Sequence, residues 1–118
     1  MNSPTRTEQV FLILTALADQ PRHGYGIVQE VEQLSEGRTR LKVGTLYGAL
    51  DRLTTEGLLE PDREEVESGR LRRYYRLTEE GVAALTEDAE RMAANARAAA
   101  QRLGTRGVRV PGTTGGLG

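Results

Sequence analysis

The spacing of the apolar residues changes at Gly57, and this change restricts the folds that the chain can adopt. Before Gly57, apolar residues recur at every third or fourth position, which is typical of helices with one buried face. After Gly57, the stretch up to Leu77 has no helical stripe and contains Pro61 and Gly69, which are typical of strands and turns. The sequence therefore predicts a run of helices followed by a pair of strands.

Three helices are expected before Gly57. Thr7 is a suitable cap for the first helix, which we expect to end near Gln20 and Pro21. The second closes at Gly37 and the third at Gly57, because glycine commonly follows the last turn of a helix. The expected apolar stripes are Val10, Phe11, Leu14, Leu17 and Ala18 in the first helix, Ile27, Val31 and Leu34 in the second, and Leu46, Leu50 and Leu53 in the third.

A β-hairpin is expected after Gly57, with its second strand running from Leu71 to Leu77. Side chains alternate between the two faces of a strand. One face then carries Leu71, Arg73, Tyr75 and Leu77, and the other carries Arg72, Tyr74 and Arg76. We expect the face with Tyr75 and Leu77 to cover the core, and the face with the remaining three side chains to point outward.

Thr78 is expected to cap a last helix that runs to Leu103, about 39 Å at 1.5 Å per residue. Its apolar residues alternate between spacings of three and four, the seam of a coiled coil: Val82, Leu85, Ala89, Met92, Ala96, Ala99 and Leu103. We interpret this seam as a dimerisation surface rather than a face folded back on its own domain. The chain then divides into a domain of three helices and a hairpin (1–77), a dimerisation helix (78–103) and a glycine-rich tail (104–118) that we expect to be disordered.

Three helices, a hairpin and a projecting helix, in this order, predict a mainly α fold with a small β-hairpin. This is a winged helix-turn-helix domain plus a long C-terminal dimerisation helix. The net charge of −1 gives no general attraction to nucleic acid, so any contact with DNA must depend on local charge. Basic residues gather before the third helix and along the second strand of the hairpin, where both groups could face the same phosphates.

Four segments resemble the signature segments of PadR-type transcriptional regulators, in the same order and at similar intervals. They are HGYGI (23–27), VGTLYGALDRL (43–53), EGLL (56–59) and SGRLRRYYRLTEEG (68–81). The resemblance covers roughly residues 8–90. It implies a winged-helix DNA-binding domain, a homodimer joined through the C-terminal helix, and repression relieved by a small-molecule effector. The single C-terminal helix is similar to that of the smaller members of the family.

In a winged helix-turn-helix domain, the third helix enters the major groove and the hairpin touches the neighbouring backbone. For Tyr47, contact with DNA is favoured over packing, because the apolar stripe of the third helix already provides its buried face and Tyr47 lies at the edge of that stripe. For Arg40 and Lys42, phosphate binding and a solvated basic loop are equal alternatives. Arg73 shares the expected inner face with Tyr75. The candidate DNA-binding residues are Arg40, Lys42, Thr45, Tyr47, Arg70, Arg72, Arg73 and, from the resemblance, Tyr25.

We expect a sequence-specific transcriptional regulator, a dimeric repressor bound to a near-palindromic double-stranded DNA operator with half-sites about 34 Å apart. The alternative is a protein-interaction module that uses the winged fold and the coiled-coil arm. Without cysteine and with His23 as the only histidine, we expect neither an enzyme nor a cofactor or metal site, and assign His23 a capping or packing role. No segment approaches the roughly 20 apolar residues of a membrane span, so we expect a cytoplasmic protein with no membrane partner.

Overall fold

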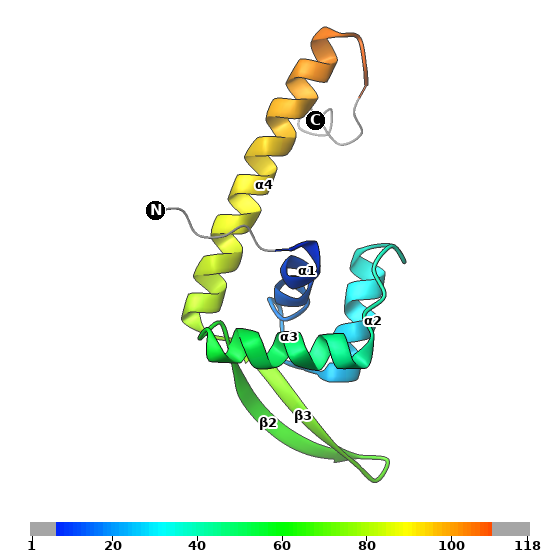
Figure 1. The fold of residues 1–118 in the computed structure, drawn as a ribbon, viewed down its shortest axis with the longest axis vertical. Coiled ribbons are helices and arrows are strands. Elements are labelled where there is room, and N and C mark those ends of the chain that lie inside the picture. Colours follow the sequence, from blue (N-terminus) through cyan, green and yellow to red (C-terminus); the bar gives the residue numbers. More distant parts are fainter. Residues whose placement is uncertain (1–6, 110–118) are drawn as a thin grey trace. The chain divides into compact units, whose positions relative to one another are not determined.

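The computed structural model describes residues 7–109 and contains, within them, four helices and three strands (Figure 1). Their order is α1 (Glu8–Ala16), β1 (Arg22–His23), α2 (Gly24–Leu34), α3 (Val43–Thr55), β2 (Leu59–Glu67), β3 (Arg70–Leu77) and α4 (Glu79–Thr105). The chain forms two compact units, one that ends at Leu85 and one that begins at Thr86. The first unit holds the three helices and the hairpin, so the predicted winged helix-turn-helix fold is confirmed.

Helix α1 begins as the sequence predicts but ends earlier. The Thr7 Oγ1 atom accepts a hydrogen bond of 3.2 Å from the backbone N–H of Val10, as expected of a helix cap. The helix stops at Ala16, where the Arg22 Nε–H group donates to the Ala16 carbonyl at 2.7 Å. Ala18 consequently lies beyond the helix and is exposed, so the prediction that it belongs to the apolar stripe is wrong.

Helix α2 differs from expectation at its C-terminal end. Ile27 and Val31 are fully buried, but Leu34 is 40% exposed and does not join the predicted stripe. The buried residue in the turn that follows is Ser35, whose hydroxyl accepts a hydrogen bond of 2.9 Å from the Thr39 N–H group and turns the chain. Gly37, with φ at +83°, provides the left-handed residue that the sequence predicted at this helix end.

The core of the first unit is formed mainly by α1, α2 and α3. Leu46, Leu50 and Leu53 of α3 are buried, as predicted, and Ala49 is buried beside them. Gly57 has φ at +84°, and the Leu58 N–H group bonds to the Leu53 carbonyl at 3.0 Å, which closes the helix as expected. The buried apolar residues are Val10, Ile13, Leu14, Ala16, Leu17, Ile27, Val31, Leu41, Leu46, Ala49, Leu50, Leu53, Leu58 and Leu59.

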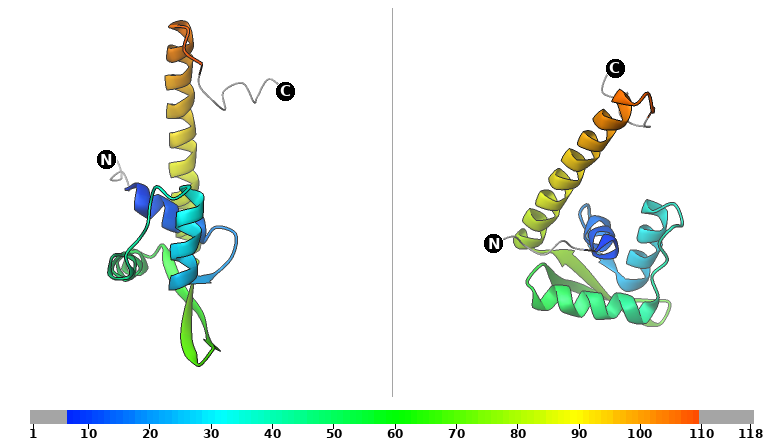
Figure 2. Two further views of the ribbon diagram at one scale, coloured as in Figure 1. Left: turned by 90° about the vertical axis from the view of Figure 1, so that its right-hand side faces the viewer. Right: turned by 45° about the horizontal axis from the view of Figure 1, so that its top comes forward.

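The sheet is antiparallel with the order β1-β3-β2, so it has one strand more than predicted. Strands β2 and β3 extend away from the helices of the first unit as a hairpin (Figure 2). Ser68 and Gly69 have φ at +51° and +78°, which is typical of the tight two-residue turns that suit the twist of a hairpin. Strand β1 pairs His23 with Tyr74. Because it has only two residues, no alternation marks it in the sequence.

Helix α4 is capped by Thr78, as predicted, and runs further than predicted. The Thr78 Oγ1 atom accepts from the Gly81 N–H group at 2.9 Å and donates to the Gly57 carbonyl at 2.6 Å. The helix continues past Leu103 through Gly104 and Thr105, and Gly107, with φ at +83°, follows its end. Two residues of the expected disordered tail are therefore helical. Residues 110–118 of that tail lie outside the described residues.

Candidate nucleic-acid interface

A hollow of about 350 Å³ lies where the starts of α2 and α3 meet strand β3. It brings together four of the eight residues that the sequence predicts to bind DNA, namely Tyr25, Tyr47, Arg70 and Arg72. Its other lining residues are Gly24, Val28, Val43 and Leu46. These four residues were not predicted to belong to the surface. They come close together through the packing of α2 and α3, which the spacing of apolar residues along the sequence does not indicate.

The two tyrosines of the hollow have partly exposed side chains that contact neighbouring residues of the same surface. Tyr25 is 56% exposed and Tyr47 is 44% exposed. A Cβ atom at Gly24 would lie 2.5 Å from the Tyr47 hydroxyl oxygen, so this phenol lies directly against the start of α2. The Arg72 guanidinium carbon is 5.9 Å from the centre of the Tyr25 ring, within reach of a cation–π interaction. The hollow thus offers hydroxyl and guanidinium donors beside apolar surface, a combination that suits phosphate and sugar.

The remaining candidates near α3 lie around its N-terminal end. Thr45 is two positions from Tyr47, about 200° around the helix, and lines a separate hollow with Thr7 and Gly48. Lys42 is exposed at the N-cap of α3, where no side chain caps the helix. Arg40 is exposed and lies 3.4 Å from a carboxylate oxygen of Glu32. The structure therefore brings Thr45, Lys42 and Arg40 to the start of α3 but not into the hollow with the tyrosines.

The arginines of the hairpin are mostly paired with its own carboxylates. We call residues 59–77 the wing; it carries five acidic and five basic side chains and has no net charge. Within the described residues, Arg70 is the wing arginine without an ion pair. The pairs are Arg63 with Asp62 (2.8 Å) and Glu65 (2.6 Å), Arg72 with Glu67 (3.9 Å), Arg73 with Glu64 (3.2 Å), and Arg76 with Glu60 (2.8 Å) and Asp62 (2.9 Å).

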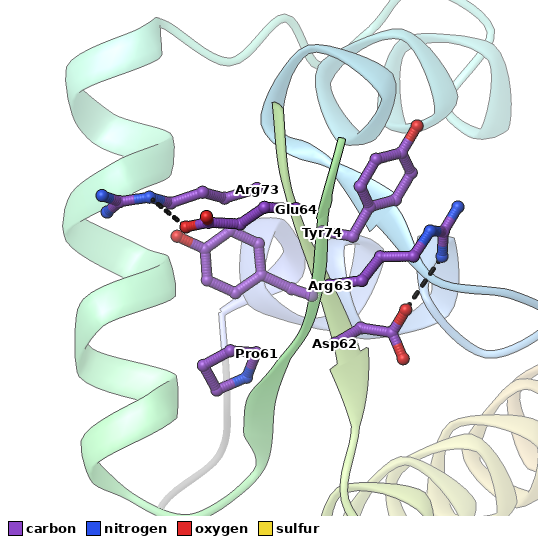
Figure 3. A pocket seen from close by; sticks show the side chains of 7 residues that line it. Pro61, Asp62, Arg63, Glu64, Arg73 and Tyr74 are labelled. Atoms are coloured by element: carbon purple, nitrogen blue, oxygen red, sulfur yellow. Dashed lines mark hydrogen bonds and ion pairs between the residues drawn. The ribbon is translucent and has the colours of Figure 1, made fainter. Parts of the chain in front are cut away.

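A bulge in β2 shapes the base of the wing. The pairing register with β3 shifts between Pro61 and Glu64. Figure 3 shows Asp62 and Arg63 on one side of the hairpin at this point, and Glu64 with Arg73 on the other side, which faces α3. Hydrogen bonds from Arg63 and then from Arg76 lower the pKa of the Asp62 carboxyl below its ordinary value.

One prediction about the faces of β3 is wrong in part. Arg72 and Tyr74 were expected to point outward, but both are half-buried, because β1 and the start of α2 cover that face. The His23 ring meets the Tyr74 ring edge-on at 5.2 Å between centroids, and its Nδ1 atom accepts a hydrogen bond from the Gly26 N–H group. The capping and packing role expected for His23 is thus what the structure shows.

Glu67 joins the two strands of the wing close to its tip. It accepts a hydrogen bond of 2.9 Å from the Tyr74 hydroxyl, which raises the pKa of the Tyr74 phenol. It also lies 3.9 Å from both Arg72 Nε and His23 Nε2. Among residues 7–109, the buried Arg72 Nε atom has no hydrogen-bond partner. Sequence reasoning missed Glu67, although it directly precedes the turn.

On the other face of β3, alternation holds as predicted. Tyr75 and Leu77 pack against the core, and burial raises the pKa of the Tyr75 phenol. Arg73 shares this face, but its side chain is 71% exposed because it lies further along the wing. Tyr75 is therefore structural, whereas Arg73 is accessible from the side of α3.

Within residues 7–109, no group of three or more histidine, cysteine, aspartate or glutamate side chains could hold a metal ion. Over the same residues, no helix combines the length and apolar character that crossing a membrane requires.

The fold is that of a winged helix-turn-helix protein, with three helices (α1, α2 and α3), then a hairpin formed by β2 and β3, and then the long helix α4. Residues 13–87 match the family described as Transcriptional regulator PadR-like, and the chain belongs to this family. The prediction of a transcriptional regulator rather than an enzyme is thereby confirmed.

Two relatives illustrate the similarity. The chain is 47% identical over 76 residues to Transcriptional regulator Rv3488 of Mycobacterium tuberculosis, covering 64% of this chain and 67% of that protein. It is 29% identical to a PadR family transcription regulator of Clostridium difficile R20291, with a TM-score of 0.68 over 82% of this chain and 99% of that one.

A third likeness concerns the fold alone. PadR of Bacillus subtilis, solved in complex with operator DNA, is 24% identical, with a TM-score of 0.59 over 66% of this chain and 44% of that one.

Proposed function

We propose that this transcriptional regulator binds a specific double-stranded DNA operator through the first turns of α3, with the wing beside the neighbouring backbone. The observation that carries the proposal is the hollow in which Tyr25, Tyr47, Arg70 and Arg72 meet. Partly exposed tyrosine side chains and guanidinium groups on one surface suit phosphate contacts, and the start of α3 adds backbone N–H donors. The operator complex of Bacillus subtilis PadR supports the same assignment by analogy of fold.

The roles within this surface follow from position. Thr45 and Tyr47 flank the first turn of α3 and are proposed to reach base edges or the adjoining phosphates. Lys42, Arg40 and Arg70 are proposed to bind phosphate, and Arg70 is the most available of the three wing candidates because it has no ion pair within residues 7–109. Tyr25 and Arg72 support the surface from α2 and β3.

Operator binding tests this proposal. We first select an operator from a randomised duplex pool and then titrate it, and a scrambled duplex, by fluorescence anisotropy at several salt concentrations. Arg70→Ala is expected to weaken binding to both duplexes and to reduce the slope of log K against log salt by about 0.9, since one phosphate contact is lost. Tyr47→Ala is expected to weaken operator binding about tenfold or more with a smaller effect on the scrambled duplex.

Arg97→Ala is the matched control, because Arg97 is an exposed arginine on α4 outside the proposed surface. It should bind like the wild type. If selection recovers no sequence that the wild type prefers, the DNA-binding assignment fails, and a protein-interaction module is the function that replaces it.

We further propose that the chain is a homodimer joined through the seam of α4. Two large apolar residues of the seam, Met92 and Leu103, are exposed in the single chain, as expected of a surface that packs against a second copy. Leu85 is different, since it packs against the core of the first unit, which limits the proposed seam at its N-terminal end. Three other members are Ala89, Ala96 and Ala99, where small side chains let helices approach closely.

Light scattering after size-exclusion chromatography tests the dimer. The wild type is expected to elute with twice the chain mass of 12.9 kDa at micromolar concentration. Met92→Glu should shift the protein to the mass of one chain, because the substitution places a charge in an apolar seam. Asn95→Glu, an exposed position outside the seam, is the control and should keep the wild-type mass. A monomeric wild type would contradict the proposal.

Repression is the proposed consequence of binding, because a dimer seated on an operator that overlaps a promoter blocks access to it. The domain roles follow: residues 1–77 bind DNA and residues 78–103 dimerise. Relief by a small-molecule effector rests on the family resemblance, and it would be observed as release of the operator when that molecule is added.

A further inference from the structure

The carboxylates of the wing present a problem for a DNA-binding hairpin. Strand β2 carries Glu60, Asp62, Glu64, Glu65 and Glu67, and the ladder sets most of them opposite the arginines of β3. The direct partners are Glu64 and Arg73, Glu65 and Arg72, Glu67 and Arg70, and, beyond the bulge, Glu60 and Arg76. The positive charge of β3 is thus matched almost residue by residue by negative charge on the neighbouring strand.

The ion pair between Glu64 and Arg73 is open to solvent. The side chain of Arg73 is 71% exposed and that of Glu64 is 54% exposed, and pairs so open to solvent contribute little to stability. The wing already has a tight turn and a backbone ladder to hold its strands together. The Glu64 carboxylate can instead act on the availability of the arginine beside it.

Glu64 and Arg73 lie on the side of the hairpin that faces α3 (Figure 3). This is the helix proposed to enter the major groove, so Arg73 is close to where the DNA backbone would run. Its guanidinium group is 3.2 Å from a Glu64 carboxylate oxygen, and a phosphate oxygen would need the same donors. Phosphate binding by Arg73 is consequently an exchange of one anion for another rather than a net gain of a charged contact.

Resting on the proposed function, we propose that the carboxylates of β2, and Glu64 above all, compete with DNA phosphates for the arginines of β3. This competition holds down the affinity of the wing for any duplex. Counterion release from phosphates favours binding to every DNA sequence equally. A wing without net charge therefore lowers the part of the binding free energy that does not depend on the DNA sequence. Discrimination is then left to the base contacts of α3, and Glu64 acts as a specificity-determining residue.

Glu64→Gln tests the proposal, because glutamine keeps the size of the side chain and removes its charge. Titrated against the scrambled duplex at about 0.1 M salt, the variant should bind roughly fivefold more tightly than the wild type. Its slope of log K against log salt should be steeper by about 0.9, the value for one additional phosphate contact. Unchanged affinity and slope would overturn the proposal.

Two further variants separate a specific pairing from a general change of charge. Glu90→Gln makes the same change in net charge at an exposed residue of α4 that belongs to the second unit, and should leave affinity and slope unaltered. In the double variant Glu64→Gln/Arg73→Ala, the gain should disappear, since the released arginine is gone. A gain that persists in the double variant, or that Glu90→Gln reproduces, would overturn the assignment of Glu64 as the competitor for Arg73.

A parallel arm distinguishes this inference from the proposed function. The wild type is titrated against its selected operator in the same buffers. If it binds the operator while Glu64→Gln behaves as the wild type on both duplexes, the inference fails and the function stands. If the wild type has no preferred operator, the function itself fails. Thermal unfolding followed by circular dichroism should show the same midpoint for Glu64→Gln and the wild type.

Discussion

Replacing Gly81 with alanine should destabilise the first unit by about 3 kcal/mol or more. A Cβ atom at Gly81 would lie 2.1 Å from the carbonyl oxygen of Leu58, and this oxygen belongs to the backbone. It cannot move away freely, because it accepts a hydrogen bond of 3.1 Å from the Thr78 N–H group. In thermal unfolding followed by circular dichroism, the midpoint should fall by more than about 12 °C, given 4–8 °C per kcal/mol for a domain of this size.

Gly48→Ala is the matched control for that experiment. A Cβ atom at Gly48 would meet nothing within 4 Å, and the residue lies within α3. Alanine should therefore stabilise the helix by about 1 kcal/mol relative to glycine. The same substitution thus has opposite signs at the two positions. Equal midpoints for the two variants would contradict the close approach of α4 to Leu58.

The second large effect is expected at the centre of the core. Leu50 is fully buried between the helices, so Leu50→Ala should lower the free energy of unfolding by about 3 kcal/mol in a urea titration. Leu34→Ala removes the same atoms from a side chain that is 40% exposed and should cost less than about 1 kcal/mol. A similar loss at both positions would mean that Leu34 is buried in solution, as the sequence pattern alone had predicted.

Helix positions were predictable where a local signal marks them. Thr7 and Thr78 are caps that act on residues three positions away, and Gly37 and Gly57 adopt the left-handed conformation that their places after helices indicated. Strand β1 could not be predicted, since two residues show no period. The burial of Ser35 in place of Leu34 depends on a hydrogen bond to Thr39 that no hydrophobic pattern contains.

The cross-strand register of the wing was open to prediction once the turn was located. A two-residue turn at Ser68–Gly69 sets each residue before it opposite the residue at equal distance after it, so Glu67, Glu65 and Glu64 lie opposite Arg70, Arg72 and Arg73. Of these three pairs, Glu64 and Arg73 also form an ion pair, whereas Glu65 pairs with Arg63 and Glu67 lies near Arg72. Because the residues of the turn were not predicted, the carboxylates opposite these arginines were not predicted either. The bulge beyond Glu64 shifts the later pairs by one residue, which no local pattern indicated.

The candidate surface was predictable residue by residue but not as a surface. Tyr25, Tyr47, Arg70 and Arg72 were all named from the sequence, yet their meeting in one hollow depends on how α2, α3 and β3 pack together. Thr45 was named beside Tyr47 because they are close along the chain, whereas the turn of the helix separates them.

Strand β2 is the open edge of the sheet, with nine residues and no neighbour on its outer side within the described chain. A long exposed edge of this kind is a template on which another molecule's strand can add and start aggregation. Here Pro61 removes one backbone donor, the bulge breaks the regular ladder, and a row of carboxylates would repel the same edge of a second copy. The wing is thereby protected against edge-to-edge self-association when the protein is concentrated.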